Sequence, residues 1–271
     1  MKQDKVDSEN EGFWDELCGS GLAQSVGITD ASPESLQKFD DTYFGFYPYL
    51  KPYLAEATDE PMRVLEIGLG YGTLGGELIA RGHNYHGLDI AAGPVAMTAE
   101  RARRAGLDPA QVQQGSALDI PHRDGYFDEV YSIGCLHHTG NLKQSIREVH
   151  RVLAPGGRAM IMLYNRWSYR RIVEAPASRI RSLRTHGIRG HRERVRAMYD
   201  TNSAGDAAPH TDYISKPGVR RLFRDFSKVS SEVRNFDHLT LFGGRFHRDR
   251  EQLLSNMGRV LGLDLYIEAI K

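Results

Sequence analysis

The residues best placed to do chemistry form a glycine-rich turn near position 68. Residues 64–73 read VLEIGLGYGT, so an apolar run leads into Gly68, Gly70 and Gly72. Glycines at such a turn let the backbone approach a ligand closely at the carboxyl end of a strand. Seventeen residues after Gly72 comes Asp89, whose carboxylate can accept hydrogen bonds from both hydroxyls of a ribose. The turn and the acid together predict a pocket for an adenosine-type ligand.

The acid at position 66 distinguishes between two adenosine-containing cofactors. A dinucleotide site uses the spacing G-x-G-x-x-G, with the pyrophosphate on a helix N-terminus. Here the third glycine comes one residue early, and Glu66 would repel a pyrophosphate beside it. The same charge is favourable beside the cationic sulfonium and amino group of S-adenosylmethionine (SAM). The pattern therefore favours methyl transfer over hydride transfer by an NAD(P)-dependent oxidoreductase.

Four segments, taken in order, resemble the successive motifs of class I SAM-dependent methyltransferases. They are VLEIGLGYG, the acid in GLDI, GSALDIPHRDGYFDEVYS and REVHRVLAPGGRAMIMLY, and they cover roughly residues 62–164. The ending GLDLYIEAIK is similar to the last strand of that family. The branch that the chain resembles best is methyltransferase type 11, typified by enzymes of ubiquinone and menaquinone biosynthesis. The resemblance implies SAM as cofactor, S-adenosylhomocysteine as its product, and no metal.

The resemblance also implies a role for the matched residues of the first two motifs. Glu66, Gly68 and Gly70 would hold the methionine part of SAM. Asp89 would bind the ribose hydroxyls, and Ile90 would pack on the adenine.

Two later motifs would complete the cofactor site. Ser116-Ala117 stands where the family commonly has Asp-Ala, facing the adenine amino group. A hydroxyl accepts from that amino group more weakly than a carboxylate does, so we expect reduced affinity for SAM. Ile133, at the end of a later strand, would lie beside the cofactor and lead toward the substrate.

A pair of histidines follows the strand that ends at Ile133. Methyl transfer needs a general base only when the acceptor arrives protonated, and such a base contributes ~10²–10⁴-fold. His138 is the first candidate for removing a proton from a hydroxyl, and His137 is the second. The alternative is that both form the scaffold of the cofactor pocket. We expect O-methylation of a small, anionic metabolite ahead of N- or C-methylation.

The elements that must position these residues alternate between short β-rich runs and helical patterns. This alternation predicts a doubly wound α/β fold with a seven-stranded, mostly parallel sheet over residues 59–271. Asn141 is expected to cap a helix that ends before the turn APGG at 154–157. The expected strands are 62–67, 85–90, 112–114, 127–133, 158–164, 228–236 and 263–270, and further helices are expected at 73–81 and 94–105.

The N-terminal segment, residues 1–58, lies outside that alternation. It contains seven aromatic residues between 39 and 53, and it predicts a helical lid over the substrate. Tyr43 and Tyr47 could shield the sulfonium or stack on a planar substrate. The alternative is that these tyrosines simply pack on the sheet.

An Arg-rich insertion is expected at residues 165–215, after the fifth strand. Residues 166–196 hold 10 Arg against two Glu, and they could form a solvated helix face, a cap over an acidic substrate or a surface for nucleic acid. Tyr164 and Arg166, at the end of the strand, are the substrate-binding candidates. The charge of the segment alone does not distinguish among these three interpretations.

Composition limits the remaining alternatives. The 271 residues are 40% hydrophobic and 26% charged with no net charge, which gives no electrostatic case for nucleic acid as a partner of the whole chain. No apolar run approaches the ~20 residues that span a bilayer. The acidic start and the two cysteines favour a cytoplasmic protein that binds a small molecule, with homo-oligomerisation left open. A non-catalytic SAM-binding module and an RNA or protein methyltransferase remain the rival functions.

Overall fold

The computed structural model describes residues 3–16, 21–28, 30–174, 193, 195–241 and 246–271. Cys18 and most of the Arg-rich segment therefore lie outside the described residues. Within the described part, no helix is both long and apolar enough to cross a membrane.

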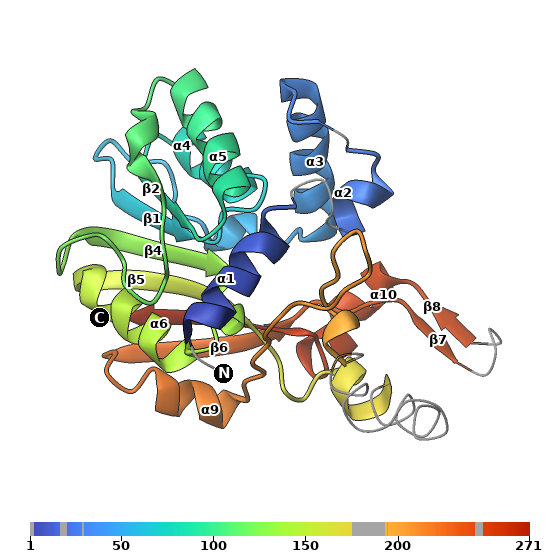
Figure 1. The fold of residues 1–271 in the computed structure, drawn as a ribbon. Coiled ribbons are helices and arrows are strands. Elements are labelled where there is room, and N and C mark those ends of the chain that lie inside the picture. Colours follow the sequence, from blue (N-terminus) through green and yellow to red (C-terminus); the bar gives the residue numbers. More distant parts are fainter. Residues whose placement is uncertain (1–2, 17–20, 29, 175–192, 194, 242–245) are drawn as a thin grey trace.

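A seven-stranded sheet with the order β3-β2-β1-β4-β5-β9-β6 forms the centre of the protein (Figure 1). Strand β9 pairs antiparallel with both of its neighbours, and the other strands of this sheet run parallel to one another. The predicted fold class is confirmed. The strands are β1 (Arg63–Ile67), β2 (Asn84–Asp89), β3 (Val112–Gln114), β4 (Phe127–Ile133), β5 (Leu153–Tyr164), β6 (Lys228–Arg234) and β9 (Asp264–Ile270).

Helices cover both faces of the sheet because its strands are apolar on both sides. Leu65 and Ile67 of β1 join the core cluster that includes α6 and α9, whereas Val64 joins the cluster that includes α4 and α5. This alternation follows from the two-residue period of a strand. In Figure 1, α4 and α5 lie above the sheet and α6 and α9 lie below it. These helices are α4 (Thr73–Ala80), α5 (Ala92–Arg104), α6 (Leu142–Val152) and α9 (Lys216–Leu222).

The turn expected at 154–157 is instead part of strand β5. Asn141 caps α6 as predicted, accepting from the backbone N–H of Gln144 at 3.3 Å. The helix then gives way directly to β5, in which Leu153 pairs with Phe127 and the next paired residue is Arg158. The residues between them form a bulge, which the Pro-Gly-Gly sequence allows because it interrupts the ladder without ending the strand.

Three helices precede the sheet: α1 (Gln3–Trp14), α2 (Gly21–Ser25) and α3 (Pro33–Phe46). Ser32 begins α3 by accepting from the N–H of Ser35 at 3.2 Å. Helix α1 lies against the turn after β4, where Asn10 Nδ2 donates to the carbonyl of His138 at 2.8 Å. Figure 1 shows α1 crossing the carboxyl ends of the strands, with α2 and α3 beside α5. The N-terminal segment is thus helical and lies over the sheet edge where ligands of such folds bind.

Several short elements were not predicted from the sequence. A hairpin of β7 (Leu239–Leu241) and β8 (Phe246–Arg248) projects from the body of the molecule and leads into α10 (Arg250–Leu254). The remaining turns are 3₁₀ helices at Lys51–Tyr53, Pro109–Gln111, Leu136–His138 and Met257–Arg259, and a π-helical turn at Arg170–Glu174.

Candidate active site

A cavity of about 460 Å³ opens at the carboxyl ends of β1, β2 and β4, where β1 pairs with both neighbours and the chain order reverses. This is the switch point at which open α/β sheets bind ligands. Its walls come from the glycine turn, the ends of β2 and β4, and helices α1 and α3. The sequence candidates that line it are Tyr43, Tyr47, Glu66, Gly68, Gly70, Asp89, Ile90, Ser116, Ala117, Ile133 and His138.

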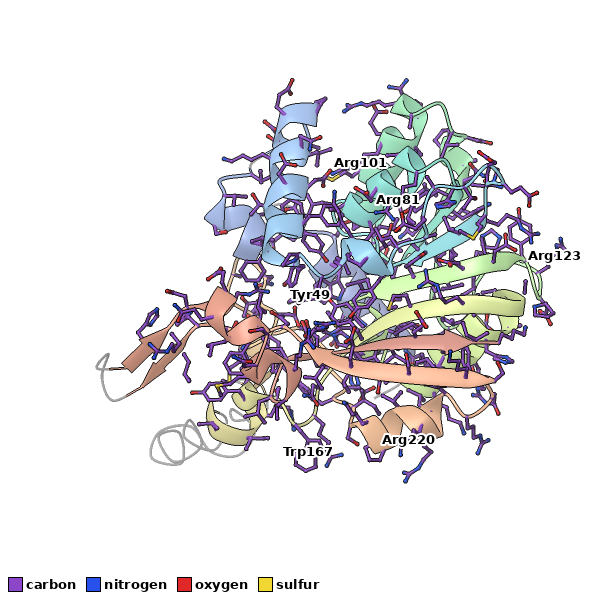
Figure 2. The ribbon with its side chains drawn as sticks, turned by 180° about the vertical axis from the view of Figure 1, so that it is seen from behind. Tyr49, Arg81, Arg101, Arg123, Trp167 and Arg220 are labelled. Carbon is purple, nitrogen blue, oxygen red and sulfur yellow. The ribbon has the colours of Figure 1, made fainter. Side chains whose placement is uncertain are left out.

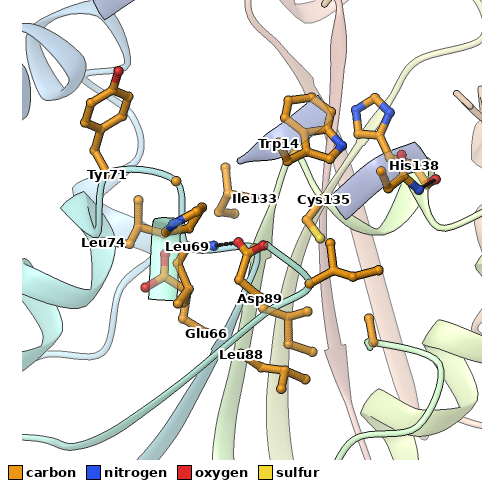
Figure 3. Close-up of a pocket in the computed structure, with 18 of the residues that line it drawn as sticks. Trp14, Glu66, Leu69, Tyr71, Leu74, Leu88, Asp89, Ile133, Cys135 and His138 are labelled. Carbon is orange, nitrogen blue, oxygen red and sulfur yellow. Dashed lines mark hydrogen bonds between the residues drawn. The ribbon is translucent and has the colours of Figure 1, made fainter. Parts of the chain in front are cut away.

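The glycine turn brings the backbone close to the strand beside it. Gly68 has φ of +85°, and a Cβ there would lie 2.3 Å from the Cβ of Cys135, so no other residue fits without movement. The turn is fixed to β2 by the carboxylate of Asp89 (Figure 3). Its Oδ2 accepts from the N–H of Leu69 at 2.7 Å, and its Oδ1 accepts from the N–H of Ala91 at 2.9 Å. Each oxygen keeps a further lone pair, enough for two ligand hydroxyls.

Glu66 is a buried acid in the wall of the cavity. It is 3% exposed, and the hydroxyl of Tyr85 donates to its Oε2 at 2.6 Å. Burial raises the pKa of this carboxyl to about 8. Among the described residues no lysine or arginine forms an ion pair with it. A cationic group of a ligand would supply the missing partner, which fits the sulfonium and amino group of SAM.

Aromatic side chains from the N-terminal helices close the other side of the cavity. Trp14 at the end of α1 lies 4.9 Å from the ring of His138, centroid to centroid. Figure 3 shows the two side chains side by side. Tyr43 of helix α3 and Tyr47, the residue after its end, contribute to the wall. The helix is held in place by Asp40, whose carboxylate pairs with Arg101 and accepts from the hydroxyl of Thr73. Trp14 lies outside the expected aromatic stretch, so the sequence did not mark it as a site residue.

The two ring nitrogens of His138 differ in their hydrogen bonding. Nδ1 lies 2.7 Å from the backbone carbonyl of His210, which can only accept, so this contact assigns the proton to Nδ1. Nε2 therefore carries a lone pair, and it has no hydrogen-bond partner among the described residues. Burial lowers the pKa of this imidazole below its usual value, which keeps it neutral at neutral pH. A neutral imidazole with a free lone pair can accept a proton.

A carboxylate from the insertion faces the same nitrogen. Asp200 Oδ2 lies 3.6 Å from His138 Nε2, and both residues line the cavity. The hydroxyl of Tyr164 donates to the carboxylate of Asp200 at 2.9 Å. Burial raises the pKa of Asp200. No local sequence pattern marked this residue, because the fold brings it to His138 from 62 positions away.

Three sequence candidates do not line this cavity. His137 is fully buried, and its ring packs 4.1 Å from that of Tyr164, because the 3₁₀ turn directs it into the protein. This position does not suit a base. Tyr164 lines a neighbouring cavity instead.

Arg166 is exposed and lies beside Trp167, whose side chain points away from the body of the protein (Figure 2). The reason is that β5 ends at Tyr164, so the strand alternation that would have directed Arg166 inward does not continue. The expectation that Arg166 faces the substrate is therefore not met in this structure.

Comparison with known proteins identifies the domain in the central part of the chain. Residues 65–161, which include the glycine turn, Asp89 and both histidines, match the methyltransferase domain family of type 11. The chain carries a SAM-dependent methyltransferase domain. Its cofactor is SAM, as the motifs indicated.

Curated relatives of this methyltransferase act on different acceptors. It is 29% identical over 197 residues to a fatty-acid O-methyltransferase of Mycolicibacterium smegmatis, covering 67% of this chain and 69% of that protein. It is 26% identical over 163 residues to norajmaline N-methyltransferase of Rauvolfia serpentina, covering 58% of this chain and 51% of that protein. The alignment thus spans about half the length of the second relative.

Solved structures show the same fold. A SAM-dependent methyltransferase from Thermotoga maritima superposes with a TM-score of 0.52 at 16% identity, covering 85% of this chain and 94% of that one. A SAM-dependent methyltransferase from Methanosarcina mazei gives a TM-score of 0.52 at 18% identity, covering 83% and 97%. At these identities the likeness concerns the architecture of the methyltransferase alone.

Proposed function

We propose that this methyltransferase transfers the methyl group of SAM to a hydroxyl of a small molecule, with His138 as the general base. The observation that carries the proposal is the free Nε2 of His138 in the wall of the cavity. Its curated relatives include a fatty-acid O-methyltransferase and a norajmaline N-methyltransferase, which supports a small-molecule acceptor.

The cavity has the groups that SAM needs. Glu66 would bind the amino group, with Gly68 and Gly70 holding the rest of the methionine part close to the backbone. Asp89 would accept from the two ribose hydroxyls. When bound, SAM supplies an electrophilic methyl group on a sulfonium.

The floor of the cavity would hold the adenine. Ile90 and Ala117 line this part and offer apolar contact to the ring. The hydroxyl of Ser116 already accepts from the N–H of Leu118 at 3.2 Å. It can still accept from the adenine amino group, but without the charge of the aspartate that is common there. Ile133, at the end of β4, would lie between the cofactor and the acceptor.

The proton of the acceptor hydroxyl would pass to Nε2 of His138. The Nδ1–H bond to the carbonyl of His210 holds the ring in the orientation that this transfer requires. Asp200, 3.6 Å from Nε2, would stabilise the imidazolium that results. After product release, the proton returns to solvent. Alignment of the acceptor in such a site contributes several kcal/mol, and Trp14 and Tyr43 exclude water from it.

The expected negative charge of the acceptor is not part of this proposal. That expectation depended on Arg166, which is exposed outside the cavity, and on arginines that lie outside the described residues. We retain from the sequence a cytoplasmic enzyme of small-molecule biosynthesis as a prediction.

The experiment compares His138→Gln with the unchanged protein. A set of phenols, alcohols, carboxylic acids and amines is incubated with SAM, and release of S-adenosylhomocysteine is measured. We expect the variant to lose ~10²–10⁴-fold in kcat and to keep its affinity for S-adenosylhomocysteine. His122→Gln, before the amino end of β4, is the matched control and should leave kcat unchanged.

If His138→Gln keeps the kcat of the unchanged protein, His138 is not the general base. If only the amines are methylated, the reaction is N-methylation and the proposal of O-methylation is wrong. Tight binding of S-adenosylhomocysteine without turnover of any acceptor would favour a non-catalytic SAM-binding module.

A further inference from the structure

A second cavity, of about 360 Å³, lies beside the first along the same edge of the sheet. It lies over the ends of β5 and β6 and the start of β9, which reaches this edge because β9 runs antiparallel. The two cavities share four lining residues, among them Tyr47, Tyr199 and Asp200. An acceptor whose hydroxyl faces His138 can therefore extend into the second cavity.

The second cavity is lined by more negative than positive charge. Asp200, Asp237 and Asp264 line it, against Arg170 as the one lysine or arginine in its described wall. Arg170 is already engaged, since its Nε donates to Asp237 at 2.7 Å. Asp200 and Asp264 have no lysine or arginine partner within ion-pair distance among the described residues. Two carboxyl groups therefore remain without a cation.

Arg250, which contacts two residues of this wall, Asn235 and Phe46, is occupied elsewhere. It is buried, and its Nη2 donates to Asn235 Oδ1 at 2.9 Å. Its guanidinium lies over the ring of Phe46 at 3.7 Å from the centroid. It does not line the cavity, so it supports the wall and leaves the two carboxyl groups available to a ligand.

Asp264 has a free oxygen inside the protein. The residue is 1% exposed, and its Oδ2 accepts from Asn235 Nδ2 at 2.9 Å. Its Oδ1 is buried and has no partner among the described residues. Burial raises the pKa of this carboxyl to about 7. A buried acceptor without a donor is unfavourable, so this position suits a ligand that brings both a donor and a positive charge.

Aromatic rings complete the wall beside these acids. Tyr164 and Tyr199 lie 4.6 Å apart, centroid to centroid, and Tyr47 joins them from the end of α3. Rings of this kind attract a cation to their faces, and the carboxyl groups beside them add directed hydrogen bonds. An anionic group would be repelled by the carboxyl groups of Asp200 and Asp264.

We propose that the second cavity binds a protonated amine carried by the acceptor, so that the molecule methylated at its hydroxyl is a small amino-bearing compound. The ammonium group donates to Asp264 Oδ1 and lies near the carboxylate of Asp200, while the hydroxyl faces His138 in the first cavity. The inference rests on the proposed function for the place of the hydroxyl, and it adds the charge of the acceptor.

The test uses three probes that share a phenol and differ in one end group. Tyramine carries an ammonium, tyrosol a neutral hydroxyl and 4-hydroxyphenylacetate a carboxylate. Each is titrated calorimetrically into the full chain saturated with S-adenosylhomocysteine. We expect tyramine to bind about tenfold or more tighter than tyrosol, with the carboxylate weakest, because a charged hydrogen bond is stronger than a neutral one.

Asp264→Asn is the variant that isolates the effect. It keeps the shape of the side chain, and the preference for tyramine over tyrosol should fall to about twofold or less. Asp225→Asn, an exposed residue paired with Arg224, is the matched control and should keep the preference. If Asp264→Asn does not fold, the probe series on the unchanged protein still decides the matter.

Failure of this inference and failure of the proposed function give different results. Equal or tighter binding of tyrosol or the carboxylate, no binding of tyramine, or a folded Asp264→Asn that keeps the preference would overturn the inference. Methyl transfer to tyrosol in that case would leave the proposed function standing. Tyramine binding that depends on Asp264, without any methyl transfer to a hydroxyl, would instead overturn the proposed function alone.

Discussion

The buried carboxyl of Glu66 should make cofactor binding depend on pH. In the free protein, burial raises its pKa to about 8, so the group is mostly protonated at pH 7. Once the amino group of the cofactor lies against it, the positive charge favours the carboxylate and lowers its pKa. Binding below pH 8 therefore releases a proton, and affinity should rise with pH.

The size of the effect follows from the two pKa values. If the cofactor returns the carboxyl toward its ordinary value of 4.5, the affinity changes about tenfold for each pH unit below about 8, since one pKa unit is about 1.4 kcal/mol. We expect S-adenosylhomocysteine, which keeps the amino group, to bind about tenfold more weakly at pH 6 than at pH 7. About one proton should be released from Glu66 per ligand bound.

The assay is calorimetric titration at both pH values in two buffers of different ionisation enthalpy, which gives the affinity and the number of protons released. Glu66→Gln removes the titrating group and keeps an acceptor for the hydroxyl of Tyr85. This variant should bind more weakly at pH 7 and lose the pH dependence. Glu100→Gln, a residue on α5 paired with Arg103 and Arg104, is the control and should behave like the unchanged protein.

The pH series can refute this reasoning in two ways. An affinity that does not change between pH 6 and 7 would mean that Glu66 does not change its protonation on binding. If the affinity of Glu66→Gln changes with pH as steeply as that of the unchanged protein, the released proton comes from another buried group.

Three further changes test other parts of the structure. Asp89→Ala should weaken binding of SAM by about 100-fold or more, because two charged hydrogen bonds of about 1.5–3 kcal/mol each are lost; equal affinity by titration would contradict the ribose assignment. With both substrates saturating, kcat of the unchanged protein should stay constant from pH 7.5 down to about 6.5, since burial lowers the pKa of His138 below its usual value; a fall centred near 6.5 would show an imidazole that is not buried. Asp40→Asn should lower the free energy of unfolding by about 1–3 kcal/mol, because Asp40 pairs with Arg101 at 2.7 Å and accepts from Thr73 Oγ1 at 2.7 Å. Urea denaturation measures this, and an unchanged midpoint would show that Asp40 does not hold α3 to the sheet domain.

The parts of the fold predicted from sequence are those with short-range patterns. Strands β3 and β4 have the predicted bounds, and the cap of α6 at Asn141 is confirmed. The glycine turn and Asp89 could be linked because a strand–turn–helix unit followed by a parallel strand fixes where both must lie. Such signals lie within a few residues of one another along the chain.

The parts that were missed depend on contacts between distant segments. Asp200 comes to the site from the insertion, outside the matched motifs, and Asp264 lies in the ending GLDLYIEAIK, which was matched only as a strand. Trp14 reaches the cavity only because α1 packs on the turn after β4. The orientation of His137 depends on the 3₁₀ turn, since adjacent residues on such a turn face different sides.

The most direct test of the account is one calorimetric series with SAM, S-adenosylhomocysteine and NADH at pH 7.5. We expect micromolar binding of the two adenosyl ligands and no measurable binding of NADH, because the third glycine of the turn comes one residue earlier than in a dinucleotide site. Binding of NADH as tight as that of SAM, or no binding of either adenosyl ligand, would contradict it.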